Sequence, residues 1–318
     1  GVNPGAFING LTVLTGLPEL VLAQQYDLRA DEIGRIISRE EGKPLAEGRG
    51  EVYRAGQFFT WFAAEALRLA GERVESVRPG IGIEVRRDPV GIVAVISPWN
   101  FPIATPAWKI APALAYGNAV LWKPANLTSA SAVALTEIIA RQDIPVGLFN
   151  LVPGAGRDIG QRLIESPALD AITFTGSVPV GRAIAASAIV NMTKLQMEMG
   201  SKNPMVIMDD ADLDRAVNIA LDGSFFATGQ RCTASSRLIV QDGIHDRFVA
   251  AVAEKVAALR SRLQEVMDAD MQVFRTEETI RRALKVISEL EERYENISIQ
   301  DKGKRFNLDL LEAVELGF

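Results

Sequence analysis

The sequence predicts an α/β fold with a largely parallel, Rossmann-like sheet that is covered by helices. Two observations predict it. Short runs rich in β-branched and other apolar residues recur along the chain, and segments with helical spacing separate several of them. Strand, helix and strand repeated in this way are typical of parallel sheets with helices on both faces. A chain of 318 residues is long enough for two domains, or for one large domain with an appendage.

The N-terminal part of the chain is predicted to be helical after an unassigned start. Residues 1–27 contain scattered glycine and proline and show no sustained period. Helical spacing then predicts a helix over Asp31–Arg39, which ends at the Gly-Lys-Pro sequence of residues 42–44. A longer helix is predicted from about Leu45 to Leu69, with an aromatic face that we interpret as packing between helices. Ile83–Arg87 alternates like a strand.

A regular series of strands and helices follows. The predicted strands are Gly91–Ile96, Asn118–Trp122, Phe149–Val152, Ala171–Phe174, Leu195–Glu198, Met205–Met208 and Arg237–Val240. The predicted helices are Ile103–Tyr116, Ser129–Arg141, Arg157–Glu165, Val180–Val190, Leu213–Phe226 and Asp246–Leu259. Because parallel sheets bind ligands at the carboxyl ends of their strands, we expect the loops after these strands to carry the site.

Composition and charge exclude several classes of partner. Forty acidic and 34 basic residues give a net charge of −6, and no block of lysine and arginine would follow a nucleic-acid backbone. The longest uncharged stretch, Pro89–Trp108, contains four prolines, which argues against a membrane-spanning helix. The uncharged N-terminus lacks a basic region, so no signal peptide is expected. A single cysteine then favours a reducing cytoplasm.

The only cysteine, Cys232, lies in a polar, glycine-containing segment that is typical of a turn between a helix and a strand. A lone thiol has no disulfide partner within its own chain. From local composition alone, a buried small apolar side chain and a reactive thiol are both open interpretations.

Other chemically interesting residues follow predicted strands. Gly176 and Ser177, with Gly181 at the start of a helix, offer backbone N–H groups to a phosphate, although glycine in such a turn often serves turn geometry alone. Lys123 follows a buried strand and needs a partner there, either a ligand or a structural carboxylate. Glu198 at the end of its strand could act as a general base or could cap the segment after it.

Separate sequence blocks, in a shared order and spacing, resemble the aldehyde dehydrogenase superfamily. They are Pro98–Pro102, Lys123–Ala125, Phe174–Ser177, Glu198–Pro204 and Gly229–Ala234. The resemblance covers about residues 28–259. Within the superfamily, the sequence is most similar to α-ketoglutaric semialdehyde (2,5-dioxopentanoate) dehydrogenases, with succinate-semialdehyde dehydrogenases as close neighbours.

The resemblance implies NAD(P)-dependent oxidation of an aldehyde, a semialdehyde such as 2,5-dioxopentanoate, to a carboxylate. The thiolate of Cys232 would attack the aldehyde to form a thiohemiacetal, and hydride transfer would leave a thioester. The side-chain amide of Asn100 and the backbone N–H of Cys232 would hold the oxyanion, and Glu198 would activate the hydrolytic water. His245, the only histidine, is predicted to lie in a loop before a helix and is not favoured as a partner of the thiol.

The resemblance also implies NADP or NAD as cofactor and no metal. It assigns the cofactor site to Ile96, Trp99, Lys123, Asn126, Gly176, Ser177 and Gly181. Lys123 and Asn126 would lie at the adenosine ribose, where many NAD-preferring relatives carry glutamate. Because a neutral Asn126 does not repel a 2′-phosphate, we expect NADP to be accepted.

The resemblance ends near Leu259, although full-length members of the family continue much further. The sequence therefore predicts an NAD(P)-binding domain over residues 28–197 and a truncated catalytic domain over 198–259. The segment that binds the nicotinamide ribose and the oligomerisation strand of the usual homo-oligomers are expected to be missing.

Residues 260–318 have a different character. They are charged, with helical spacing, and residues 262–318 resemble the helical domain of succinate dehydrogenase and fumarate reductase flavoproteins. This resemblance predicts a seam between two enzyme fragments near residues 258–261. The alternative function is accordingly a catalytically incompetent fusion or truncated fragment that retains at most dinucleotide binding. Weak or absent activity with 2,5-dioxopentanoate and NADP is the sequence-based prediction.

Overall fold

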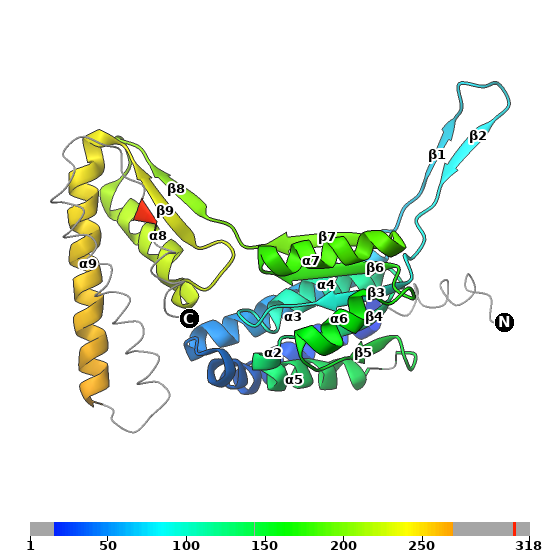
Figure 1. Cartoon of the computed structure of the whole chain (residues 1–318), viewed down its shortest axis with the longest axis horizontal. Coiled ribbons are helices and arrows are strands. Elements are labelled where there is room, and N and C mark those ends of the chain that lie inside the picture. Colours follow the sequence, from blue (N-terminus) through cyan, green and yellow to red (C-terminus); the bar gives the residue numbers. More distant parts are fainter. Residues whose placement is uncertain (1–15, 143, 270–307, 310–318) are drawn as a thin grey trace. The chain divides into compact units, whose positions relative to one another are not determined.

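The computed structural model describes residues 16–142, 144–269 and 308–309 (Figure 1). The chain divides into two compact units, Gly1–Met199 and Gly200–Phe318. Each unit has its own sheet and its own apolar core.

The first unit is built around a parallel, five-stranded sheet with the strand order β5-β4-β3-β6-β7. Its strands are β3 (Ile92–Ile96), β4 (Ala119–Lys123), β5 (Phe149–Leu151), β6 (Ala171–Gly176) and β7 (Lys194–Met199). These bounds confirm the predicted strands to within a few residues. The strand order reverses between β3 and β6, which makes the carboxyl ends of these two strands the topological switch point of the sheet.

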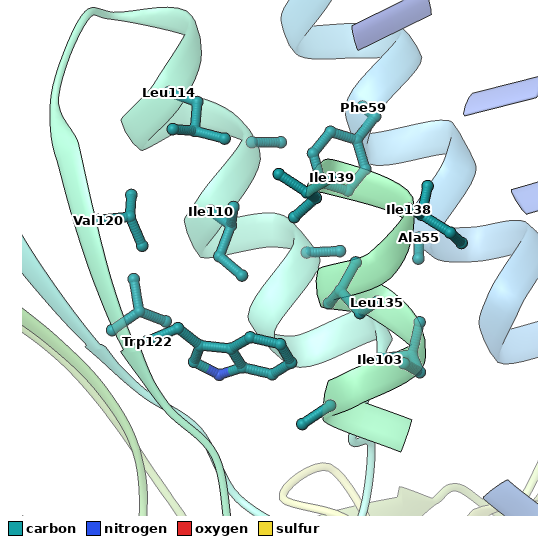
Figure 2. Close-up of a cluster of buried hydrophobic side chains, with 14 of the residues drawn as sticks. Ala55, Phe59, Ile103, Ile110, Leu114, Val120, Trp122, Leu135, Ile138 and Ile139 are labelled. Carbon is teal, nitrogen blue, oxygen red and sulfur yellow. The ribbon is translucent and has the colours of Figure 1, made fainter. Parts of the chain in front are cut away.

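Helices cover both faces of this sheet, as the sequence predicts. On one face lie α2 (Gly16–Glu41), α3 (Leu45–Ala66), α4 (Ala104–Ala115) and α5 (Ser129–Ala140). Their shared core contains Phe59, Ile110, Trp122 and Leu135, all fully buried (Figure 2). On the other face, α6 (Gln161–Ile164) and α7 (Val178–Ala188) pack Ile164 and Ile184 against the sheet. Strands buried on both faces carry nearly continuous apolar sequences, which is why they are easy to recognise.

The N-terminal region differs from the prediction in one respect. Helix α2 begins at Gly16, so residues 16–27, which the sequence left unassigned, are helical; residues 1–15 lie outside the described residues. Tertiary packing of its later turns stabilises a helix that lacks a periodic signal at its start. Its end is as predicted, because Gly42 adopts a φ of 97° that stops the helix.

A hairpin of two short strands follows α3. Strand β2 (Gly82–Val85) lies where a strand is predicted, and it pairs antiparallel with β1 (Glu72–Glu75). The sequence did not reveal β1, because all of its residues are exposed and it has no apolar face. Figure 1 shows this hairpin projecting away from the sheet and helices of its unit.

The helix predicted over Arg157–Glu165 is only partly a regular α-helix. A π-helical turn over Gly156–Gly160 precedes α6 and shortens the regular helix. Glycine at both ends of this turn disfavours a continuous α-helix there.

The second unit has a separate sheet with the strand order β10-β9-β8. Strands β8 (Asn203–Ile207) and β9 (Ser235–Val240) are parallel and are joined through α8 (Leu213–Phe225). The last two predicted strands therefore form their own sheet instead of extending the first one. The core of this unit contains Val217 and Phe248.

Two predictions near the C-terminus are wrong. Helix α9 (Asp242–Ala269) begins earlier than predicted, so His245 lies within a helix and not in a loop. Leu308–Asp309 form β10, antiparallel to β9, where helix is predicted; this pairing satisfies backbone groups at the edge of β9. The predicted seam at residues 258–261 lies inside α9, and residues 270–307 and 310–318 of the predicted tail lie outside the described residues.

Across the described ranges, no helix is long and apolar enough to cross a membrane.

Candidate active site

The loop after β3 carries Trp99 and Asn100, which are both half-buried. Its start is joined to the neighbouring strand: the Ser97 N–H donates to the Lys123 carbonyl at 3.2 Å, and Trp122 Nε1 donates to Ser97 Oγ at 2.9 Å. Ile96, the last residue of β3, lies opposite Lys123 in the strand register. The structure therefore brings Ile96 and Lys123 together at the carboxyl edge of the sheet.

The same loop is held from the helical side by an ion pair that the sequence did not reveal. Lys43 Nζ lies 2.7 Å from Glu51 Oε2, and both side chains are 1% exposed. The ammonium also donates to the backbone carbonyl of Asn100 at 2.7 Å and lies 3.9 Å from the centre of the Phe101 ring. A lysine directly after a helix-ending glycine carries no pattern that would indicate such a long-range contact.

Lys123 ends β4 and is buried. Its Nζ donates to the Pro124 carbonyl at 2.9 Å, and within the described part of the chain no carboxylate pairs with it. Burial lowers the pKa of this ammonium. Gly160 leaves room for the lysine, because a Cβ there would lie 3.3 Å from Lys123 Cε. Asn126 is exposed at the start of the next 3₁₀ turn.

The turn after β6 contains the predicted phosphate-binding residues. Gly176 is the last residue of β6, and a Cβ there would lie 2.5 Å from the Phe174 ring. Ser177 is the N-cap of α7 and makes no side-chain capping hydrogen bond. Gly181 is buried in the first turns of α7, where a Cβ would lie 2.5 Å from Met199 Sδ. A Cβ at either position would displace a neighbouring side chain, so both glycines also serve the packing of the strand-to-helix turn.

Glu198 lies near the end of β7 and is exposed. Gln196 Nε2 donates to Glu198 Oε1 at 3.3 Å, and Gln196 Oε1 in turn accepts from Lys109 Nζ at 2.8 Å. Lys109 also donates to Thr173 Oγ1 at 2.8 Å. Burial lowers the pKa of Lys109 to about 8, while the charge of Glu198 acts to raise it.

Sequence reasoning missed Lys109. It is the only charged residue within the predicted helix Ile103–Tyr116, and that isolation is the signal that could have identified it. A buried ammonium next to the proposed base is a further titratable group at this edge of the sheet.

Cys232 lies in the turn before β9 and is exposed, which contradicts the interpretation of a buried apolar side chain. Asn203 Nδ2 donates to the Cys232 carbonyl at 2.5 Å and to the Ala234 carbonyl at 3.4 Å. Arg231 Nη2 donates to the carbonyls of Asp222 and Gly223, each at 2.9 Å. The thiol thus lies on a turn whose backbone is bonded to β8 and whose Arg231 side chain is bonded to α8.

His245 and a possible metal site remain to be placed among the predicted site features. His245 Nδ1 lies 3.0 Å from Asp246 Oδ1, its neighbour in α9. Asn100 and Glu198 belong to the first unit and Cys232 to the second. Among the described residues, no three His, Cys, Asp or Glu side chains group in a way that could hold a metal ion.

Comparison with known proteins identifies the family of the chain. A profile of the aldehyde dehydrogenase family matches residues 20–308. The chain belongs to this family. The match begins earlier and ends later than the predicted range of about residues 28–259, and it overlaps most of residues 262–318, for which a flavoprotein-like helical domain is predicted.

Individual relatives agree with this assignment. The chain is 44% identical over 226 residues to the α-ketoglutaric semialdehyde dehydrogenase of Bacillus subtilis, covering 71% of this chain and 46% of the relative. It is 39% identical over 229 residues to the NADP-dependent succinate-semialdehyde dehydrogenase of Escherichia coli, covering 72% and 48%. The chain therefore spans about half the length of the curated relatives it matches.

Solved structures of aldehyde dehydrogenases have the same fold. The enzyme from Brucella melitensis biovar abortus superposes with a TM-score of 0.74 at 37% identity, covering 80% of this chain and 54% of that chain. A betaine aldehyde dehydrogenase from Staphylococcus aureus in complex with NAD+ gives a TM-score of 0.76 at 31% identity, covering 81% and 55%.

Proposed function

We propose that this chain oxidises an aldehyde to a carboxylate with a nicotinamide dinucleotide, and that Cys232 is the nucleophile. The observation that carries the proposal is an exposed thiol on a turn that Asn203 bonds to β8 and the Arg231 side chain bonds to α8. A thiolate is a strong nucleophile toward carbonyl carbon, and an exposed thiol is accessible to a substrate.

The reaction has two stages: a thioester forms on Cys232 through a tetrahedral thiohemiacetal, and water then hydrolyses this thioester. Sulfur attacks the aldehyde carbon, and the carbonyl electron pair moves to oxygen, where the Asn100 side-chain amide and the Cys232 N–H would stabilise it. Loss of hydride from the thiohemiacetal carbon leaves a thioester on Cys232. Glu198 would then take a proton from a water molecule as that water attacks the thioester carbon. The Cys232 sulfur is the leaving group, and the carboxylic acid is the product. A bound nicotinamide would supply the hydride acceptor.

The residues at the switch point fit a dinucleotide. The N-terminus of α7 has no side-chain cap, so its first N–H groups are suited to a phosphate. Lys123 offers a buried ammonium that no described carboxylate neutralises. Ile96, Trp99, Gly176 and Gly181 lie on the same elements, β3, β6 and α7, or directly after them. We propose that these residues hold NADP or NAD.

The exposed Asn126 is proposed to permit NADP. Asn126→Glu would place a carboxylate near the 2′-phosphate, so affinity for NADP should fall by about tenfold or more while affinity for NAD changes little. Isothermal titration calorimetry with each dinucleotide measures this without any turnover. Equal loss of both affinities would contradict the assignment of Asn126 to the ribose.

The proposed substrate is a semialdehyde such as 2,5-dioxopentanoate, because relatives named for semialdehydes match the chain. We further propose a cytoplasmic protein, on the basis of its single cysteine. No nucleic acid or membrane partner is proposed. The flavoprotein-like nature of residues 262–318, the domain bounds and the effect of the expected missing strand on homo-oligomer formation stay predictions.

The test is NADPH formation by the purified chain. We expect slow NADPH formation from 2,5-dioxopentanoate, abolished by Cys232→Ala and reduced about 100-fold or more by Asn100→Ala. Thr233→Ala, an exposed neighbour of the thiol, is the matched control and should retain the rate. No NADPH from a folded chain that binds NADP would favour the alternative, a catalytically incompetent fragment that retains dinucleotide binding.

A further inference from the structure

The buried ion pair between Lys43 and Glu51 contacts the loop of Asn100 in more than one place. One oxygen of the carboxylate, Glu51 Oε2, pairs with Lys43. The other, Glu51 Oε1, accepts from the N–H groups of Ile103 at 2.8 Å and Ala104 at 3.1 Å. These N–H groups begin α4, whose own N-cap residue supplies no side-chain cap. Glu51 therefore caps α4 from another helix, where a negative charge is also favoured by the helix dipole.

Lys43 contacts the backbone of Asn100, the proposed oxyanion donor. Its ammonium donates to the carbonyl of Asn100 and lies over the ring of Phe101, so one buried cation contacts both residues that flank this peptide bond. Ser97 joins the upstream end of the loop to β4, and Glu51 holds the downstream end at Ile103. Asn100 thus lies between fixed points on both sides.

The two helices that flank Lys43 in the chain, α2 and α3, pack closely against each other. Helices α2 and α3 approach at backbone distance: a Cβ at Gly48 would lie 2.7 Å from the Gly34 carbonyl oxygen, and a Cβ at Gly34 would lie 2.9 Å from the Arg49 nitrogen. Such close packing leaves little freedom for the segment between the helices, which contains Lys43.

Stability alone does not explain why two full charges are buried here. An apolar pair of similar volume is often as stable as a buried ion pair, or more so, because desolvation offsets the attraction. What an apolar pair cannot do is hold a carbonyl and two N–H groups in a defined direction. We propose that the Lys43–Glu51 pair is a positioning device that fixes the backbone of Asn100, and so aims its side-chain amide at the developing oxyanion. The catalytic part of this inference rests on the proposed function.

The principal variant is Lys43→Met/Glu51→Leu, which removes both charges together and leaves no unpaired buried charge. In the full-length chain, we expect amide exchange at Ile103 and Ala104 to become about tenfold faster or more, while peptides from β4 and β6 change by less than about twofold. The side-chain amide of Asn100 should give a single pair of resonances in the wild type, and these should broaden or double in the variant.

A second variant separates the two halves of the device. Lys43→Met/Glu51→Gln keeps an amide oxygen for the N–H groups of α4 but removes the ammonium from the Asn100 carbonyl. We expect protection at Ile103 to stay within about twofold of the wild type while the Asn100 resonances still broaden. This variant also keeps the proposal testable if the first one does not fold.

The matched control is Asp31→Asn/Arg49→Gln, which removes an exposed ion pair between the same two helices. It should change neither the exchange nor the Asn100 resonances. Single, unshifted Asn100 resonances in either folded test variant would overturn the proposal.

Turnover adds a readout that separates this inference from the proposed function. In an active chain, both test variants should lower kcat about tenfold or more with little change in the KM for NADP. When either is combined with Asn100→Ala, kcat should fall by less than about a further twofold below that of Asn100→Ala alone. Full additivity with Asn100→Ala would overturn the positioning role. A chain that forms no NADPH, yet shows the expected loosening of Asn100, contradicts the proposed function and supports the positioning of the loop.

Discussion

The loop of Asn100 and the turn of Cys232 are held in place by different means. The loop is fixed by a buried ammonium and a buried carboxylate that reach it from α2 and α3. The turn is fixed by a neutral amide, Asn203, and by Arg231, whose guanidinium also lies 5.0 Å from the Phe226 ring centre. Bonds between buried charges are costly to break one at a time, whereas water can replace contacts at an exposed turn. We therefore expect the loop to be the more rigid of the two.

The largest effect should follow from breaking the ion pair on one side only. Glu51→Ala leaves Lys43 charged and buried and removes the cap of α4, so unfolding free energy should fall by about 3–5 kcal/mol. All four tryptophans lie in the first unit, so their fluorescence during urea unfolding reports on it. The control is Glu65→Ala on the same helix, whose partner Arg68 is exposed; it should change stability by about 0–1 kcal/mol. Equal losses of stability in Glu51→Ala and Glu65→Ala would show that the buried ion pair contributes no more to stability than the exposed one.

An intermediate effect is expected at Glu41, which borders the same pair. Burial raises the pKa of this carboxyl from 4.5 to about 7, and Oε1 is buried without a partner among the described residues, while Oε2 accepts from the Lys43 N–H at 2.8 Å. Since the folded-state pKa lies above the unfolded one, the folded state retains a proton that the unfolded state loses between these pH values. Stability should therefore fall as the pH rises from about 4.5 to about 7.

Glu41→Gln removes this titration. Relative to the wild type, the variant should gain on the order of 1–2 kcal/mol of stability between about pH 5 and about pH 8, after allowance for partial exposure of the carboxyl. Urea unfolding at both pH values measures the gain. A difference that does not vary with pH would mean that Glu41 is already ionised in the folded protein.

The smallest effect is expected at the turn of the thiol. Asn203→Ala removes the amide that donates to the carbonyls of Cys232 and Ala234, and should destabilise the second unit by about 1 kcal/mol. Hydrogen exchange in β8 and β9 reports this change, and the reaction rate of Cys232 with a thiol reagent should rise as the turn loosens. A loss as large as that of Glu51→Ala would reverse the expected order of rigidity.

Local pattern was enough to predict most elements of this chain. Apolar runs such as Gly91–Ile96, followed by helical spacing, predict buried parallel strands correctly because such strands are apolar on both faces. The exposed strand Glu72–Glu75 escaped prediction because it lacks that signal. The start of α2 escaped because packing, not periodicity, stabilises it. His245 was assigned to a loop because the Gly243 that precedes it resembles a loop residue, yet α9 includes both.

The sequence by itself determined the fold class, the strand ends that carry Asn100, Lys123, Gly176 and Glu198, and a thiol placed on a turn between a helix and a strand. These features depend on neighbouring residues and on their order. Only the tertiary structure decided that Lys43 holds the Asn100 carbonyl, 57 residues away, and that Lys109 meets Gln196 beside Glu198. It also decided that β8 and β9 form a sheet of their own. The partners of these buried charges follow from packing in three dimensions: a lone lysine in an apolar helix can indicate a buried charge, but no local pattern indicates which distant group it contacts.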